Sequence, residues 1–207
     1  KNSQPLYGFS IIGEVEKHRL KKNNTARAGD LLVMTRPIGV GILANALKSG
    51  VIEQKDIAAS TLAQITGNNA FGRTLSESPE VSSLTDITGF GLIGHISEMV
   101  GLGQLDVDLD TSGLVFYDGT ESLAVAVTSA DSGIFSNIKK YAQNVEYLTD
   151  PPLARKFLLH DPQTNGGLLF TVSAEGFEKN RQKWQALCPD LIVIGQMTEG
   201  TGKIKVC

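Results

Sequence analysis

The sequence of 207 residues predicts an α/β fold in which helices pack on one mixed sheet. Short apolar runs of strand length alternate along the chain with longer amphipathic segments of helical period. Glycine clusters stand beside these runs, where such elements would begin and end. Hydrophobic residues make up 41% of the chain, which is enough to bury a core and excludes intrinsic disorder as the main state.

The first half of the chain begins with a β-rich segment, Tyr7–Lys17, which predicts a strand. A polar turn leads to the apolar run Leu31–Thr35, which ends at Pro37. A helix with one apolar face is then expected over Gly39–Ser49. Next we expect helices over Gln54–Thr66 and Asn69–Leu75, a short apolar run at Leu84–Ile87, a helix over Leu92–Val100 and an alternating strand over Leu105–Leu109.

The second half adds helices and completes the sheet. A proline pair precedes one of the helices, a position that proline favours. Another predicted helix is long and amphipathic, and the final strands are short β-rich runs. The expected helices are Ser122–Thr128, Ile134–Tyr141, a short helix that follows Pro151-Pro152 and ends at about Leu159, and Ala174–Leu187; the expected strands are Gly167–Val172, Leu191–Gly195 and Lys203–Val206.

Composition excludes several classes of protein. A net charge of −3, with both signs interspersed, argues against a nucleic-acid module built on a basic face. No apolar run approaches the ~18 residues of a membrane helix, and no signal peptide is visible, so we expect no membrane partner. The two cysteines, Cys188 and Cys207, have no zinc-site spacing and form no disulfide framework, which favours the cytoplasm.

The first candidate site is the segment Thr85–His95, TDITGFGLIGH. Asp86 stands between two threonines, just before a glycine turn and the start of a helix. Glycines let backbone amides approach a phosphate, a helix N-terminus favours its charge, and aspartate oxygens suit Mg²⁺. The pattern predicts a site for a hard cation or a phosphate-bound cation. Alternatively, Asp86 or Thr88 only caps the helix and the glycines permit tight packing.

The same segment also supports a different ligand. Gly89, Gly91 and Gly94 satisfy G-x-G-x-x-G between a short strand and a helix, and Asp108 and Asp110 stand at the end of the next predicted strand. This arrangement is typical of a dinucleotide-binding βαβ unit. An NAD-binding protein is therefore a competing hypothesis, and a non-catalytic interaction domain is another.

Two further clusters stand where predicted elements meet. The segment Thr35–Gly41 joins a strand to a helix, and its Arg36 is either a phosphate ligand or an ordinary surface arginine. The segment His160–Gly167, HDPQTNGG, is a turn before a strand and is either a polyanion site or a plain strand-entry turn. The residues that would line such a site are Thr164, Asn165, Gly166 and Gly167.

Four segments of the chain together resemble selenophosphate synthetase, also called selenide, water dikinase. They follow the order of that family, span nearly the whole chain and are Tyr7–Lys17, Ala28–Leu43, Leu84–Met99 and His160–Phe170. The resemblance implies the C-terminal domain of the aminoimidazole ribonucleotide synthetase-like superfamily. It also implies an enzyme that makes selenophosphate from ATP, selenide and water and releases AMP and orthophosphate.

The resemblance assigns roles to residues of the first and second clusters. In that family the aspartate at the position of Asp86 is a ligand of the required Mg²⁺. The nucleotide phosphates would then lie near Thr85, Thr88, Gly89 and Gly91, together with Thr164, Asn165, Gly166 and Gly167. ATP and selenide are the implied partners, and a homodimer is implied for the full-length enzyme.

The sequence also departs from the family. We expect residues 1–18 to be the last strand of an N-terminal ATP-binding domain and residues 19–207 to be the C-terminal domain, so that the chain begins within a longer protein. Neither cysteine matches the family's nucleophile, and we therefore expect no catalytic residue here and no activity of this chain alone. Asn165 replaces the usual serine, and Ser132–Asn137 replaces a Gly-Gly-Thr loop that carries an arginine.

Overall fold

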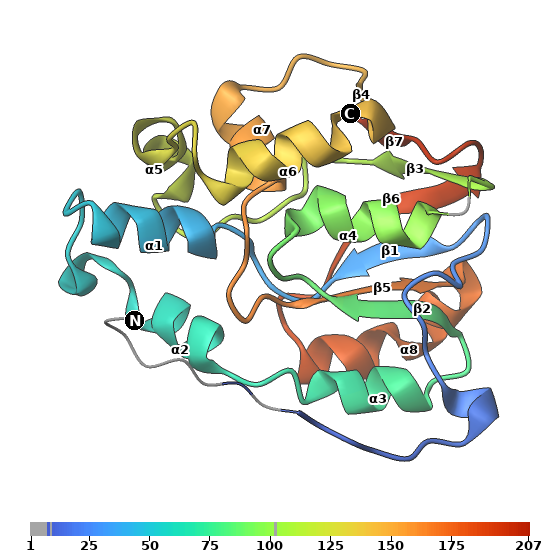
Figure 1. The fold of residues 1–207 in the computed structure, drawn as a ribbon. Coiled ribbons are helices and arrows are strands. Elements are labelled where there is room, and N and C mark those ends of the chain that lie inside the picture. Colours follow the sequence, from blue (N-terminus) through green and yellow to red (C-terminus); the bar gives the residue numbers. More distant parts are fainter. Residues whose placement is uncertain (1–7, 9, 102) are drawn as a thin grey trace.

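The computed structural model describes residues 8, 10–101 and 103–207, and their strands form one seven-stranded sheet (Figure 1). The order across the sheet is β2-β5-β1-β6-β3-β7-β4. Neighbours from β2 to β3 are antiparallel, whereas β7 is parallel to both β3 and β4. The strands are β1 (Leu31–Met34), β2 (Val81–Asp86), β3 (Leu105–Leu109), β4 (Val145–Tyr147), β5 (Leu168–Val172), β6 (Ile192–Glu199) and β7 (Ile204–Val206).

The helices connect these strands and confirm the predicted α/β class. None of those in the described part of the chain combines the length and apolarity that crossing a bilayer requires. The α-helices are α1 (Val40–Lys48), α2 (Ala59–Thr66), α3 (Phe71–Glu77), α4 (Gly91–Val100), α5 (Thr120–Val127), α6 (Gly133–Tyr141), α7 (Leu153–Leu159) and α8 (Ala174–Leu187), with short 3₁₀ turns at Lys17–Arg19, Gln54–Asp56 and Ala142–Asn144.

Alternation along the strands divides the core into two layers. In β1, Leu32 and Met34 join the cluster that contains the apolar side of α4, whereas Val33 joins the cluster on the opposite face. That second cluster contains Trp184 of α8 and Leu75 of α3. Because successive side chains of a strand point to opposite faces, the sheet is covered on both sides. Figure 1 shows α4 and α6 on one face and α3 and α8 on the other.

Several predicted elements differ from the observed ones. Tyr7 lies outside the described residues, and the described part of the first predicted strand (8, 10–16) is not a strand; Ile11 and Ile12 are over 90% exposed there. Among residues 8, 10–101 and 103–207, no strand pairs with this segment, and pairing is what defines a strand. Strand β4 was not expected because three residues carry little periodicity, and β6 runs beyond the predicted Gly195 to Glu199.

The segment after the first 3₁₀ turn covers the outer edge of β2. The amide of Leu84 donates to the Lys22 carbonyl at 3.0 Å, and the hydroxyl of Ser83 donates to the same oxygen at 2.9 Å. Thr25 Oγ1 donates to the Ser82 carbonyl at 2.6 Å. Unpaired strand edges attract other chains, so this segment protects the edge. It also brings Asn23 beside α4.

Candidate functional site

Three loops meet at one end of the sheet. We call them the Asp86 turn (residues 86–91), the Thr164 turn (residues 160–167) and the Arg36 turn (residues 35–41). They join because β5 lies between β2 and β1: Asp86 is opposite Leu168, and Met34 is opposite Leu169. The three clusters that the sequence singled out therefore lie side by side, which no single segment could have indicated.

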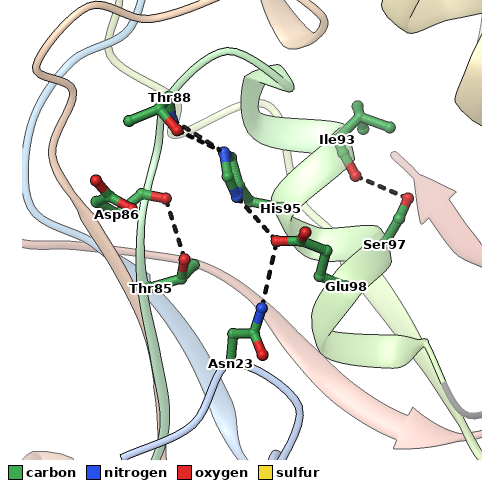
Figure 2. Close-up of polar contacts among 8 residues, drawn as sticks. All are labelled: Asn23, Thr85, Asp86, Thr88, Ile93, His95, Ser97 and Glu98. Atoms are coloured by element: carbon green, nitrogen blue, oxygen red, sulfur yellow. Dashed lines mark hydrogen bonds and ion pairs between the residues drawn. The ribbon is translucent and has the colours of Figure 1, made fainter. Parts of the chain in front are cut away.

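Asp86 is the last residue of β2, and its side chain is exposed. Figure 2 shows that Thr85 Oγ1 donates a hydrogen bond to the backbone carbonyl of Asp86, at 3.2 Å, and not to its carboxylate. Among residues 8, 10–101 and 103–207, no hydrogen bond or ion pair engages its carboxylate. The cap position of α4 is Phe90, and no side chain caps this helix. The interpretation of Asp86 or Thr88 as a helix cap is therefore wrong.

The Thr164 turn packs directly against the Asp86 turn. The amide of Ile87 donates to the Gly167 carbonyl at 2.9 Å, and the amide of Gln163 donates to the Thr88 carbonyl at 3.0 Å. A side chain at Gly166 would collide with the carbonyl of Ile87. Glycine is thus required here because the two backbones approach closely. This close contact fixes the position of one loop relative to the other.

Asn165 stands at the outer side of this turn with a φ of 53°, a conformation that asparagine tolerates better than most residues. Its Nδ2 donates to the carbonyls of Ile65 at 2.6 Å and Gly67 at 2.7 Å. These carbonyls belong to the end of α2, so the asparagine amide caps that helix. Thr164 is exposed, whereas Gly166 and Gly167 are buried. Proximity of these residues to a phosphate remains a prediction.

Buried side chains of the Thr164 turn cap the start of α1. Gln163 Oε1 accepts hydrogen bonds from the amides of Gly39 and Val40, both at 3.1 Å. Asp161 Oδ2 accepts from the amides of Gly41 at 2.9 Å and Ile42 at 3.3 Å. The first N–H groups of a helix otherwise lack partners and attract anions. Since they are satisfied internally, α1 offers no phosphate site, and the turn ties α1 to the sheet.

Sequence reasoning missed these two capping residues. The available signal was an acid and an amide inside a turn flanked by apolar segments, which indicates buried polar groups that need partners. Asp161 is fully buried, and burial raises its pKa to about 7, although hydrogen bonds from Gln163 and from the amides of Ile42 and Gly41 act in the opposite direction. Its charge therefore depends on pH near neutrality.

The Arg36 turn is connected to the other two by its arginine. Arg36 donates to the carbonyls of Asn68 at 2.5 Å and Asn165 at 3.3 Å. Its guanidinium therefore bridges the end of α2 and the Thr164 turn. The structure favours this bridging role over a free surface arginine.

The glycines of the Asp86 turn have different surroundings. Gly91 has a φ of 68°, and a side chain there would lie 2.7 Å from the carbonyl carbon of His160. Gly94 packs against Phe90 and Tyr141, and a side chain would collide with both. Gly89 is exposed and faces open space. Two of the three glycines thus serve packing, and the third leaves the turn accessible.

The topology does not form the dinucleotide-binding unit that the glycine pattern suggested. Such a unit needs the strands before and after the helix to be neighbours. Strands β2 and β3, which flank α4, are separated in the sheet by β5, β1 and β6. The G-x-G-x-x-G match therefore comes from helix packing and a tight turn, and the NAD hypothesis lacks its structural basis.

The segment Ser132–Asn137 forms the start of α6. Ser132 caps this helix by accepting a hydrogen bond from the amide of Phe135 at 3.5 Å. Asn137 Nδ2 donates to the carbonyls of Gly89 at 3.0 Å and His160 at 2.9 Å. Through Asn137, the segment therefore contacts and stabilises both the Asp86 turn and the Thr164 turn.

Cysteine chemistry is not favoured at this site. Burial raises the pKa of the Cys188 thiol to about 11, so the thiolate form that acts as a nucleophile is scarce. Cys207 is exposed at the far end of the chain, after β7. The described residues also contain no group of three or more His, Cys, Asp or Glu side chains that could hold a metal ion.

The site nevertheless fits one ligand position of a magnesium ion. The carboxylate of Asp86 is exposed and makes no hydrogen bond or ion pair with the described residues, and hard cations prefer carboxylate oxygens as ligands. Mg²⁺ bound with nucleotides usually takes one or two carboxylates together with phosphate oxygens and water. Asp86 can supply one of these ligands, and the others must come from outside the described residues.

Comparison with known proteins supports a relationship over nearly the whole chain. The model for "AIR synthase related protein, C-terminal domain" matches residues 27–207. Selenide, water dikinase of Burkholderia orbicola (strain MC0-3) is 37% identical over 98% of this chain and 57% of its own length. The enzyme of the same name from Clostridioides difficile (strain 630) is 34% identical over 84% of this chain and 49% of its own length.

Solved structures with low sequence identity share the fold. The hydrogenase maturation protein HypE in complex with ATP has a TM-score of 0.62 and 14% identity, over 94% of this chain and 52% of its own. Thiamine-monophosphate kinase from Stenotrophomonas maltophilia K279a has a TM-score of 0.59 and 16% identity, over 93% of this chain and 54% of its own.

This chain spans about half the length of the curated relatives that it matches. The resemblance to selenide, water dikinase found in the four sequence segments is confirmed, as is the predicted fold class. The chain belongs to the family of AIR synthase related proteins, whose C-terminal domain it contains.

Proposed function

We propose that this chain is the C-terminal part of a selenide, water dikinase, which converts ATP, selenide and water into selenophosphate, AMP and orthophosphate. The names of its relatives support this proposal, together with identities of 34–37% over most of the chain. The single structural observation that carries it is the exposed and unengaged Asp86 carboxylate, at the point where three loops meet. ATP binding by HypE, whose fold is similar, is consistent with it.

In this proposal Asp86 is a ligand of the Mg²⁺ that accompanies ATP. When bound, the cation neutralises phosphate charge and helps to orient the groups that react. The chain's own contribution is to hold the carboxylate at a fixed place. Thr88, Gly89 and Gly91 lie on the same turn, and Thr85 directly precedes it in β2, so we place the nucleotide phosphates beside these four residues.

The Thr164 turn supplies the second wall of the proposed phosphate site. Thr164 is exposed there, and Asn165, Gly166 and Gly167 fix the path of the backbone. The carbonyls of Asn165, Gly166 and Gly167 already accept hydrogen bonds within the fold. Their proposed role is therefore positional, and they exclude water from one side of the phosphates.

The described residues do not make a complete catalytic centre. One carboxylate cannot hold a metal–triphosphate assembly, and the thiol of Cys188 is kept protonated by burial. We propose that the remaining ligands and the nucleophile come from an N-terminal ATP-binding domain, that the full-length enzyme is a cytoplasmic homodimer, and that this chain alone is inactive.

The test compares the full-length enzyme with this chain in an assay of selenide-dependent AMP formation from Mg-ATP. We expect turnover only in the full-length enzyme. Asp86→Asn in that enzyme should lower turnover by about a hundredfold or more, because the neutral amide is a poor ligand for a hard cation. Asp118→Asn, which changes another exposed aspartate, is the matched control and should keep wild-type activity.

Two results would contradict the proposal. Selenophosphate formation by this chain alone would show that the described residues suffice. Wild-type turnover and an unchanged Mg²⁺ requirement in the Asp86→Asn enzyme would remove the proposed role of Asp86. Thermal unfolding of each variant checks that the fold is intact.

A further inference from the structure

The backbone of the Asp86 turn is held by a side chain from α4. The amide of Thr88, two residues after Asp86, donates to Nε2 of His95 at 3.0 Å, and Thr88 Oγ1 lies 3.3 Å from the same nitrogen. Other polar contacts of this turn involve the Asp86 carbonyl, the Ile87 amide, the Gly91 amide and the carbonyls of Thr88 and Gly89. The His95 side chain is therefore the hydrogen-bond acceptor of the Thr88 amide.

The contacts of His95 define its tautomer. A backbone amide can only donate, so Nε2 must accept and carries no proton. The proton is then on Nδ1, which donates to Glu98 Oε2 at 3.1 Å. This assignment follows from the hydrogen-bond network. His95 is 5% exposed, and its ring stacks at a tilt on Phe90 with centroids 5.6 Å apart, so it has little freedom to rotate.

Glu98 connects this pair to the segment that covers the edge of β2. Its Oε2 also accepts from Asn23 Nδ2 at 3.4 Å. Figure 2 shows the resulting chain of contacts from Asn23 through Glu98 and His95 to Thr88, with Asp86 on the same turn. Carboxylates that accept from a histidine fix the orientation and tautomer of its ring. The network thus sets the position of the Thr88 amide from within the fold.

We propose that His95, oriented by Glu98, is a positioning residue that fixes the Asp86 turn in the geometry that binds Mg-ATP. The inference rests on the proposed function, because it concerns the same metal ligand. Without the acceptor, the part-buried amide of Thr88 loses its partner and the turn can rotate to find another one. A shift of about 1 Å at the carboxylate is enough to weaken a metal site.

The first experiment needs no nucleotide or metal. In this chain, ¹⁵N NMR of the His95 ring should show a proton on Nδ1 and none on Nε2 at neutral pH. Hydrogen exchange of the Thr88 amide should be slow in the wild type and at least about tenfold faster in His95→Leu, the size expected for one net hydrogen bond. Amides in the centre of β1 and β5 should be unchanged.

A conservative variant and a matched control separate positioning from general packing. In His95→Gln, the amide oxygen of glutamine reaches the place of Nε2 and should restore slow exchange at Thr88. Ser97→Ala removes another buried hydrogen bond of α4, from Ser97 Oγ to the Ile93 carbonyl at 2.9 Å, without touching the turn (Figure 2). It should leave Thr88 exchange and the Mg²⁺ dependence of turnover as in the wild type.

The second experiment measures the Mg²⁺ dependence of turnover in the full-length enzyme. His95→Leu should raise the Mg²⁺ concentration at half-maximal turnover by about tenfold and change the maximal rate less, and His95→Gln should recover most of the loss. An Nε2-protonated ring, or Thr88 exchange that is insensitive to His95→Leu, overturns the inference.

The remaining outcomes separate the inference from the proposed function. If His95→Leu leaves the Mg²⁺ dependence unchanged while Asp86→Asn abolishes turnover, the positioning role is wrong and the proposed function stands. If Asp86→Asn also leaves turnover and Mg²⁺ dependence unchanged, both are wrong.

Discussion

Two aspartates of this sheet have opposite surroundings. Asp86 ends β2 at the site, exposed and unengaged, whereas Asp106 in β3 is 5% exposed. Asp106 Oδ1 accepts from the amides of Thr201 at 2.7 Å and Lys203 at 2.8 Å, and its Oδ2 lies 3.0 Å from the ammonium of Lys205. Burial raises the pKa of Asp106, but these contacts outweigh it and lower the pKa to about 2.

The difference indicates which carboxylate is structural and which is available. Asp106 holds the loop between β6 and β7, so its charge is already used by the fold. Asp86 contributes nothing comparable to the described residues, and an aspartate without a structural partner at a loop junction is a candidate for binding a ligand. The same residue type at two strand positions thus serves stability in one place and, in the proposed function, binds a ligand in the other.

The largest expected difference follows from making the same substitution at both positions. Asp106→Ala should lower the free energy of unfolding by about 2 to 3 kcal/mol, because it leaves two amides and the Lys205 ammonium without their acceptor. Asp86→Ala should stay within about 0.5 kcal/mol of the wild type, as for most exposed substitutions. Urea denaturation of this chain measures both values.

Lys205→Met provides the control for the ion pair. It keeps the hydrophobic stem and both amide hydrogen bonds of Asp106, so it should cost less than Asp106→Ala. Equal destabilisation by Asp86→Ala and Asp106→Ala would contradict the conclusion that only Asp106 stabilises the fold.

A third aspartate, Asp161, should affect the pH dependence of stability in the opposite direction to Asp106. The pKa of buried Asp161 is raised to about 7 from an ordinary value of 3.8, so between these values the folded state binds more protons than the unfolded one. Stability should therefore decrease as pH rises through this window, with about 2 to 3 kcal/mol lost between pH 5 and pH 8. Asp106, with its lowered pKa, should lose stability only as pH falls below about 4.

Asp161→Asn isolates this effect. The amide oxygen of asparagine can still accept from the amides of Gly41 and Ile42, but the side chain no longer titrates. Urea denaturation at pH 5 and pH 8 should show a smaller loss of stability in the variant than in the wild type. An identical pH dependence of the two proteins would mean that Asp161 does not titrate in this range.

Local patterns predicted most of the elements but not their meeting point. The amphipathic pattern of Ala174–Leu187 and the alternation of Leu105–Leu109 agree with the observed bounds, because each depends on its own residues. The junction of the Asp86, Thr164 and Arg36 turns depends on β5 lying between β2 and β1, which is a long-range pairing. Spacing along the chain carries no information about that order.

The supporting residues of the site were harder to recognise than Asp86 itself. Asp86 stands beside glycines in a pattern with a chemical meaning. The contact of His95 with Glu98 follows from their spacing along one helix, but the bond of His95 to Thr88 needs the turn to fold back on α4. Gln163 caps a helix more than 120 residues earlier in the chain. Such partners become visible only in three dimensions.

A smaller effect than at Asp106 or Asp161 is expected at Asn165, which stands where the selenophosphate synthetases that the chain resembles usually carry serine. Asn165→Ser removes the two hydrogen bonds to the end of α2 and places a less tolerant residue at a φ of 53°. We expect a loss of about 1 kcal/mol in the free energy of unfolding, since the site is exposed and water can replace part of the bonding. Asn165→Gly loses the same bonds without the backbone strain, so it should be at least as stable as Asn165→Ser. If both variants unfold like the wild type, the asparagine does not hold α2, and its difference from serine must be explained at the proposed phosphate site instead.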